Sequence, residues 1–233
     1  AKTRPADEVG GDSFAITEKN GHYFIYIGDV TGHGAPAGLI MMMVNTLFDV
    51  LISDFDNTDQ LAAEINRVLK PRVNQSMFMT TAFFRWVPKE EKLFYTGCGH
   101  EHILIYRAAE GVVEKIPTGG IALAMAEDIT DLVSEKELNL NDQDIVLLYS
   151  DGITEAVNED GELYGLDQLV ASLKLHGSKG ESLDVFEAIS HDVVNFVGDA
   201  YQHDDMTLLV MRYTPNGFDP KRKENLVSTS WNV

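Results

Sequence analysis

The sequence is poor in cysteine, and Cys98 is the only one among its 233 residues. A single thiol cannot form a disulfide within the chain, which fits a reducing cytoplasm. Long apolar runs are missing as well: LIMMMV at 39–44 is far shorter than the roughly 20 residues that a membrane-spanning helix needs. The first residues, AKTRPADE, are polar and show no signal peptide. We therefore expect a cytoplasmic domain that makes no membrane contact.

Basic residues are also scarce. Lysine and arginine total 18 against 37 acidic residues, so the formal net charge is 18 − 37 = −19. Such an acidic field repels nucleic-acid phosphates, and we expect no nucleic acid among the partners. It is compatible with divalent cations, although solubility alone explains most of a charge of this size. Hydrophobic residues make up 44% of the chain and predict a packed core, and the abrupt start leads us to expect a domain from a longer protein.

Aromatic and β-branched runs predict strands, and apolar residues at helical spacing predict helices. The first strand is entered through an Asn20-Gly21 turn, and Pro36 stands where a first helical turn tolerates it. Several strands follow one another as hairpins, which favours antiparallel sheets layered with helices over a doubly wound parallel sheet. We expect one domain over 1–214, and a linker or the start of another element over 215–233. The expected strands are 22–29, 77–87, 92–99, 102–108, 131–140, 144–150 and 206–213, and the expected helices are 37–52, 58–70, 166–174 and 182–197.

Aspartates recur at the ends of the predicted strands. Asp29 ends the first strand in IGDV, and Asp12 lies in VGGDSF shortly before it. Asp151 follows another strand in YSDG, and Asp204 and Asp205 precede the last strand in HDDMT. Any one aspartate beside glycine is explained as a turn former. As a set they favour hard divalent cations such as Mg²⁺ or Mn²⁺, which prefer oxygen ligands, but spacing alone does not bring them together.

Ordered motifs along the chain resemble a known family. PADEVGGDSF, GDVTGHGAPAGLIMM, SDGITEA and HDDMTLLV, with YTGCGHEHILIYRAAEGVVEKIPTGGIALAM between them, resemble the SpoIIE/RsbU-type branch of the metal-dependent protein phosphatases. This branch is the bacterial arm of the protein phosphatase 2C (PP2C, or PPM) superfamily. The match covers roughly residues 5 to 213. It implies an α+β fold, a four-layer α-β-β-α sandwich with two antiparallel sheets flanked by helices, and a site for two Mn²⁺ or Mg²⁺ ions.

The resemblance also implies roles for the aspartates. Asp29 would bridge both ions, and the backbone carbonyl of Val30 would bind one of them. Asp151 and Asp204 would bind the other ion, and Asp12 would support the site directly or through water. The implied metal ligands are therefore Asp12, Asp29, Val30, Asp151, Asp204 and, ranked second, Asp205, and the implied catalytic residues are Asp12, Asp29, Asp151 and Asp204.

The implied activity is hydrolysis of phosphoserine or phosphothreonine by a hydroxide that bridges the two metals. The implied substrate is a phosphorylated STAS-domain (anti-anti-sigma-type) protein of bacterial partner-switching signalling. An upstream sensor or receiver domain would control the activity through the helix after Gly34, and a homodimer is a further option. The motifs depart from the family pattern in places. Ala15 replaces a variable aspartate, GCGH replaces Asn-Ala-Gly-His, and no clear arginine clamps the phosphate, with Arg4 only a minor candidate.

Several residues admit other interpretations. His33 in TGHG is either a general acid or, as we favour, a residue that shapes the loop. Cys98, His100 and His102 alternate as zinc ligands on a strand would, but no fourth ligand at zinc spacing is evident. Two histidine-aspartate doublets, His191-Asp192 and His203-Asp204, resemble the metal-binding pairs of all-helical HD-type phosphohydrolases, although the many predicted strands argue against that fold.

Two alternatives concern function. The glycines around Asp29 suggest a phosphate cradle, but the Gly-Lys-Ser/Thr ending of a P-loop is missing. The remaining rival is a catalytically weak phosphatase-like module that regulates a partner by binding. It gives no physical reason to keep several mutually repelling carboxylates.

Overall fold

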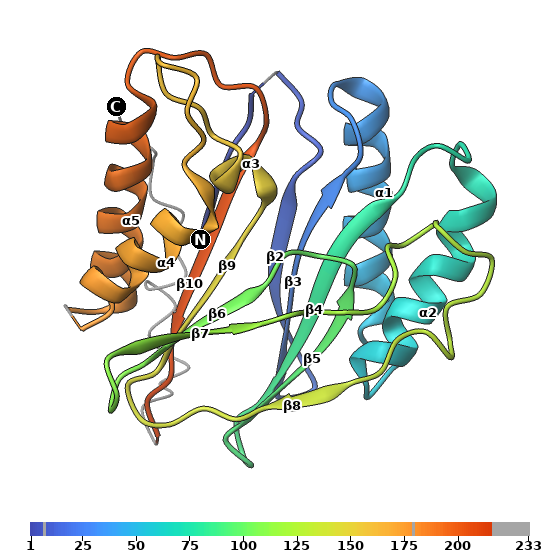
Figure 1. The fold of residues 1–233 in the computed structure, drawn as a ribbon. Helices are drawn as coiled ribbons and strands as arrows, with labels where there is room; N and C mark the ends of the chain where they lie inside the picture. Colours follow the sequence, from blue (N-terminus) through green and yellow to red (C-terminus); the bar gives the residue numbers. More distant parts are fainter. Residues whose placement is uncertain (7, 179, 216–233) are drawn as a thin grey trace. The chain divides into compact units, whose positions relative to one another are not determined.

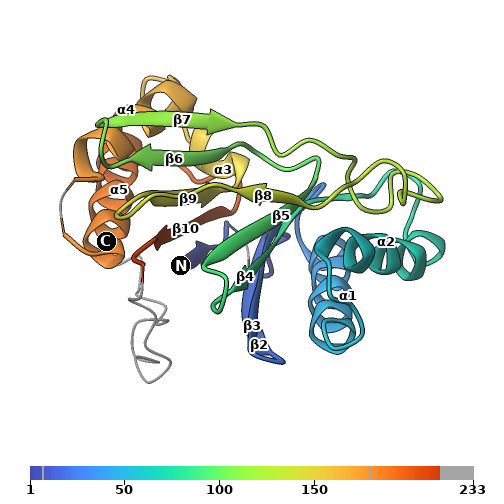
Figure 2. The same ribbon diagram turned by 90° about the horizontal axis from the view of Figure 1, so that it is seen from below.

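The computed structural model describes residues 1–6, 8–178 and 180–215. These residues form two compact units. Unit 1 contains residues 1–6, 102–117 and the described residues from 140 on, and unit 2 contains residues 8–101 and 118–139. Each unit has one five-stranded sheet in which every neighbouring pair of strands is antiparallel. Helices cover one face of each sheet (Figures 1 and 2).

The sheet of unit 2 has the strand order β2-β3-β4-β5-β8. It begins with a hairpin whose two turn residues, Asn20 and Gly21, have φ angles of 55° and 79°. Positive φ at both positions is typical of the tight turn that joins antiparallel strands, as the sequence predicted. The elements of unit 2 are β2 (Ser13–Lys19), β3 (His22–Val30), α1 (Ala35–Leu51), α2 (Thr58–Leu69), the 3-10 turn η1 (Lys70–Arg72), β4 (Met79–Val87), β5 (Lys92–Cys98) and β8 (Lys136–Leu138).

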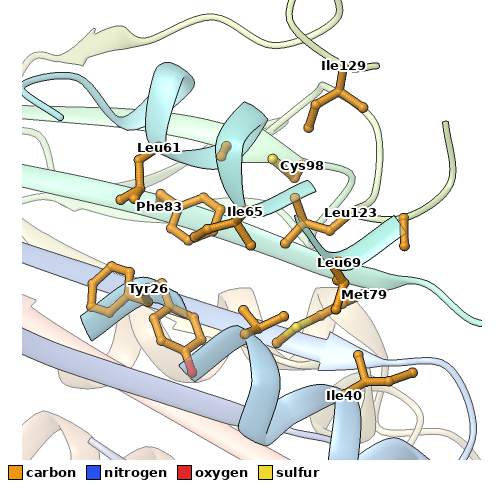
Figure 3. Close-up of a cluster of buried hydrophobic side chains, with 14 of the residues drawn as sticks. Tyr26, Ile40, Leu61, Ile65, Leu69, Met79, Phe83, Cys98, Leu123 and Ile129 are labelled. Carbon is orange, nitrogen blue, oxygen red and sulfur yellow. The ribbon is translucent and has the colours of Figure 1, made fainter. Parts of the chain in front are cut away.

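The core of unit 2 lies between its sheet and the helices α1 and α2 (Figure 3). The ring of Tyr26 on β3 contacts that of Phe48 on α1 with centroids 4.8 Å apart, and Phe48 stacks on Phe83 of β4 at 6.2 Å. Leu61 and Ile65 of α2 are fully buried in the same cluster. The apolar residues at helical spacing therefore hold α1 against β2 and β3, the strand that carries Asp29, and α2 against β4 and β5 of the same sheet.

The sheet of unit 1 has the strand order β1-β10-β9-β6-β7. The central strand β9 is buried at every position, which agrees with its continuous apolar sequence. Helix α5 starts with a capping box in which the side chains of Glu181 and Asp184 each accept the backbone N–H of the other residue. The elements of unit 1 are β1 (Lys2–Arg4), β6 (Ile103–Arg107), β7 (Val112–Ile116), β9 (Ile145–Tyr149), α3 (Asp151–Thr154), α4 (Gly165–His176), α5 (Ser182–Val197) and β10 (Met206–Arg212).

The expected strands and helices are confirmed to within a few residues, with one strand much shorter than predicted. Within 131–140 only Lys136–Leu138 pairs with a neighbour. Strands β1, β2 and β7 were not predicted. The edge strand β7 alternates little between apolar and polar residues and is mostly exposed, so its sequence gives no strand signal. No helix in the described part of the chain is both long and apolar enough to cross a membrane. The domain limits 1–214 stay a prediction, and 216–233 lies outside the described residues.

Candidate metal-binding residues in the two units

Asp29 and Val30 end strand β3 in unit 2. They pair in register with Thr80 and Met79 of β4, so β4 fixes their backbone on one side. Gly28 precedes them where a larger residue does not fit, because a Cβ there would lie 2.6 Å from the Met79 side chain and 2.9 Å from the Thr80 carbonyl oxygen. Glycine thus permits the close backbone approach at the end of the strand. The Asp29 side chain is half-buried.

Asp12 is buried, with 6% of its surface exposed, directly before strand β2. The next residue, Ser13, pairs in register with Gly28. A Cβ on Gly11 would lie 3.0 Å from the carbonyl oxygen of Val30, so the Asp12 segment passes close to that carbonyl. The structure therefore brings together the predicted residues of unit 2 on adjacent strand ends, which sequence spacing could not establish.

His33 lies in the turn between β3 and α1. Its neighbours Gly32 and Gly34 have φ angles of 85° and 75°, a backbone conformation that favours glycine. Gly34 is the N-cap of α1, and its carbonyl accepts the N–H of Gly38 in the first helical turn. The His33 side chain is exposed. The glycines thus shape a tight exit from the strand, and the interpretation of His33 as a loop residue stays a prediction.

Asp151 is the first residue of the short helix α3 and directly follows β9 and its cap residue Ser150. Ser150 Oγ donates to the Asp205 carbonyl at 3.2 Å and accepts the Thr207 N–H at 2.9 Å. A Cβ on Gly152 would lie 2.0 Å from the same Asp205 carbonyl. In unit 1, the end of β9 and the start of β10 are therefore in direct contact. Sequence reasoning did not identify Ser150, although it stands beside Asp151 in YSDG.

Asp204 and Asp205 have different surroundings. Asp205 is buried, and its Oδ1 accepts the backbone N–H of Ala6 at 2.7 Å. Asp204 is half-buried, and one of its oxygens accepts the Asp205 N–H at 2.8 Å. The Gln202 amide donates to the carbonyls of Arg4 and Asp204, both at 2.8 Å. Each carboxylate thus accepts one backbone N–H, but Asp205 is buried and holds the distant N-terminal segment, whereas Asp204 is half-buried and bonds to the next residue.

The donor set is chemically suited to hard cations. Carboxylates and a backbone carbonyl are the ligands that Mg²⁺ and Mn²⁺ prefer, and glycines leave room beside them. Among residues 1–6, 8–178 and 180–215, no three His, Cys, Asp or Glu side chains come together as a formed metal site. The structure brings the predicted ligands together pairwise, Asp12 with Asp29 in unit 2 and Asp151 with Asp204 in unit 1, and their metal-binding role stays a prediction.

Cys98 does not fit the zinc interpretation. Cys98 is fully buried in the core of unit 2, and burial raises the pKa of its thiol to about 12 (Figure 3). A protonated thiol in an apolar core does not serve as a metal ligand at neutral pH. The Nδ1 atom of His100 lies 3.1 Å from Thr80 Oγ1. Thr80 is the residue of β4 that pairs with Asp29 of β3. Thr80 was not identified from the sequence.

The HD-type interpretation is wrong, because each unit is built on a sheet. His191 lies on α5, where Asn195 Nδ2 is 2.9 Å from its Nδ1. Asp192 accepts a hydrogen bond from Ser172 Oγ at 2.6 Å and lies 2.9 Å from His176 Nε2, both on α4. This aspartate therefore joins α4 to α5.

Comparisons with known proteins identify a related phosphatase and similar solved structures. The chain is 26% identical over 210 residues to phosphoserine phosphatase RsbU of Bacillus subtilis, covering 89% of this chain and 61% of RsbU. It thus spans less than two thirds of this relative. The solved SiaA-PP2C domain of Pseudomonas aeruginosa is similar over 91% of this chain and 84% of its own, with a TM-score of 0.79 and 20% identity. RsbX in complex with magnesium is similar over 91% and 93%, with a TM-score of 0.67 and 14% identity.

These likenesses confirm the expected α+β, PP2C-like fold class. The sequence model of the family described as Stage II sporulation protein E (SpoIIE) matches residues 19–214, well over half of the chain. The match begins within strand β2 and runs past the last strand, β10. The chain therefore belongs to the SpoIIE family, the SpoIIE/RsbU-type branch of PPM phosphatase domains.

Proposed function

We propose that this chain is a Mn²⁺- or Mg²⁺-dependent serine/threonine protein phosphatase domain of a bacterial signalling protein. The observation that carries the proposal is the placement of aspartates at adjacent strand ends in each unit. Asp12 directly precedes β2 and Asp29 ends the neighbouring strand β3 in unit 2, and Asp151 precedes Gly152, which lies against the segment of Asp204 in unit 1. Family membership and the name of the relative RsbU, a phosphoserine phosphatase, support the same reaction class.

The proposed ligands of two ions are Asp29, the Val30 carbonyl, Asp151 and Asp204, with Asp12 in support. Once bound, such cations make a water molecule nucleophilic near neutral pH and offset the negative charge of the phosphoryl group. The magnesium in the solved RsbX complex supports a divalent cation of this kind. Asp205 is a lower-ranked ligand, since it is buried and its carboxylate holds the N-terminal segment through the Ala6 N–H, whereas Asp204 is half-buried and its carboxylate bonds to the residue beside it.

The chain's own residues hold this arrangement. Gly28 and Gly152 allow the backbone to approach within distances that a side chain would forbid. Ser150 ties the β9 end to the β10 start through Asp205 and Thr207, which supports the proposed place of Asp151 beside Asp204. A backbone held in this way reduces the reorganisation that cation binding requires, and preorganisation of charge is a large term in catalysis.

The proposed substrate is a phosphorylated STAS-domain protein, on the strength of the resemblance to the SpoIIE/RsbU branch. The chain spans 61% of RsbU, so this relative has further segments. We propose that an upstream sensor or receiver domain, in the same chain or in a complex, controls the phosphatase in the cytoplasm. A homodimer is the second proposed mode of control.

The test is release of inorganic phosphate from a STAS-domain protein phosphorylated on serine, with and without Mn²⁺. We expect release that depends on Mn²⁺ and stops on chelation. Calorimetry of the purified chain with Mn²⁺ should show binding. If the chain neither binds Mn²⁺ nor releases phosphate, the phosphatase proposal fails and the binding-module alternative stands.

A further inference from the structure

A small pocket lies in unit 1 between α3, the end of α5 and the start of β10. Its volume is about 100 Å³. Ala156, Val197 and Met206 line it and are at most 7% exposed, so they make an apolar floor. Glu155 and Tyr201 also line it and are exposed, and the half-buried Asp204 stands at its side. The pocket therefore opens beside a proposed metal ligand.

The rim of the pocket is held by hydrogen bonds. The Glu155 N–H donates to the Asp151 carbonyl at 2.7 Å, which places Glu155 one turn after Asp151. Gln202 holds the opposite wall by donating to the Asp204 carbonyl at 2.8 Å. The Tyr201 ring packs edge-on against His203 with centroids 5.1 Å apart. These contacts give the rim a defined shape before any ligand arrives.

The size of the pocket limits what it can take. Small-molecule sites usually measure roughly 300–1,000 Å³. This pocket of about 100 Å³ is too small for a metabolite and suits a single side chain.

The chemistry of the walls selects the kind of side chain. The apolar floor matches an aliphatic stem, and the Glu155 carboxylate with the Tyr201 ring matches a cation at its end. None of the ion pairs found among the described residues involves the Glu155 carboxylate, which is exposed. An exposed carboxylate at the rim of an apolar pocket is suited to the cation at the end of a lysine or arginine side chain.

We propose that this pocket binds a lysine or arginine side chain of the substrate protein next to its phosphorylated residue. The proposal rests on the proposed phosphatase function and adds a determinant of substrate choice. A chain with a formal net charge of −19 repels the anionic phosphoryl group, and a lysine or arginine seated at Glu155 offsets part of that repulsion when the substrate docks.

The experiment uses synthetic phosphoserine peptides in which one lysine is scanned through the flanking positions of an alanine background. Hydrolysis of p-nitrophenyl phosphate with Mn²⁺ reports basal activity separately. We expect lysine at one or two positions to raise kcat/KM by about fivefold, as a partly exposed ion pair can do, mostly through a lower KM. Glutamate at those positions should lower kcat/KM.

Variants assign the effect to the pocket. Glu155→Gln should bring kcat/KM for the lysine peptide down to that for the alanine peptide. Glu155→Lys should reverse the preference, so that kcat/KM is higher for the glutamate peptide than for the lysine peptide. Glu110→Gln, which removes the same charge from an exposed turn outside the pocket, should keep both the lysine preference and the basal activity. Basal activity with no lysine preference, or a preference that survives Glu155→Lys, overturns the pocket proposal. Failure to hydrolyse either the peptides or p-nitrophenyl phosphate overturns the phosphatase function itself and the pocket proposal with it.

Discussion

Gly152 lies against the backbone of Asp205, so that a Cβ on Gly152 would be 2.0 Å from the Asp205 carbonyl oxygen. Gly152→Ala must push the start of β10 away from α3, and with it Asp204 from Asp151. We expect the variant to lose about 1–3 kcal/mol of unfolding free energy, as overpacked sites do. Its affinity for Mn²⁺ should fall as well. Denaturant unfolding and calorimetry with Mn²⁺ measure the two effects.

Gly161→Ala is the matched control for this change. Gly161 has a φ of 78°, but a Cβ added there would meet no atom within 4 Å, so alanine costs backbone strain without a clash. It should lower stability and leave Mn²⁺ affinity and phosphatase activity intact. Equal losses of Mn²⁺ affinity in both glycine variants would show that the Gly152 effect is not specific to the aspartates.

Asp29→Asn and Asp151→Asn keep the size of each side chain and remove its charge. If both carboxylates bind the catalytic cations, each variant should lose at least about a hundredfold in kcat/KM, because bound metals supply several kcal/mol of transition-state stabilisation. Mn²⁺-dependent release of phosphate from a phosphorylated STAS-domain protein measures this. Asp54→Asn, an exposed aspartate in the turn after α1, should behave as the unmodified chain. Normal turnover by Asp29→Asn or by Asp151→Asn would contradict the assigned set of metal ligands.

Much of the fold could be predicted because its signals are local. Apolar spacing identified α1 and α2, and the Asn20-Gly21 pair identified the tight turn before β3, whose two residues have positive φ angles. The partner strand β2 on the other side of that turn was not predicted. Strand β7 was missed because an exposed edge strand needs no apolar alternation. Strand pairing joins residues far apart in sequence, as where Lys2 pairs with Leu208, and no local pattern reports it.

The sequence also identified only part of the candidate site. The aspartates stood out because each lies beside a strand end, yet only the structure shows which of them adjoin. The distinction between Asp204 and Asp205 rests on the hydrogen bond from the Ala6 N–H, some two hundred residues away in sequence. Thr80 gave no signal, since a threonine within a strand is ordinary, and its place opposite Asp29 depends on register.

A buried ion pair ties the start of α2 to the sheet of unit 2. Arg85 Nη2 lies 2.6 Å from Glu135 Oε2, and both side chains are 10% exposed. Glu135 Oε1 also accepts the Thr58 N–H at 2.8 Å at the first residue of α2. Glu135→Gln leaves the Arg85 charge buried without its partner and should cost about 3–5 kcal/mol of unfolding free energy. Denaturant unfolding monitored by circular dichroism gives this value.

The double variant Arg85→Met, Glu135→Gln separates charge burial from packing. It should be more stable than Glu135→Gln alone, because no unpaired charge remains in the interior. Glu64→Gln removes a partner from the exposed pair with Arg67 and should have a much smaller effect. A double variant less stable than either single one would contradict the argument from charge burial.

Cys98 gives the stability of unit 2 a defined dependence on pH. Burial raises the pKa of its thiol from an ordinary 9.0 to about 12. Between these values the unfolded chain loses the proton and the folded chain keeps it, so the free energy of unfolding falls as pH rises, by up to about 1.4 kcal/mol per pH unit. Below pH 9 the contribution of the thiol to the free energy of unfolding is fully present.

Denaturant unfolding from pH 8 to pH 10 tests this dependence. The free energy of unfolding should fall less steeply with pH for Cys98→Ala than for the unmodified chain, whatever the cavity costs overall. The range stops at pH 10 because Tyr26, whose pKa burial raises from 10.0 to about 12, adds its own slope above it. Parallel curves for the two proteins would show that the Cys98 thiol does not titrate differently on unfolding.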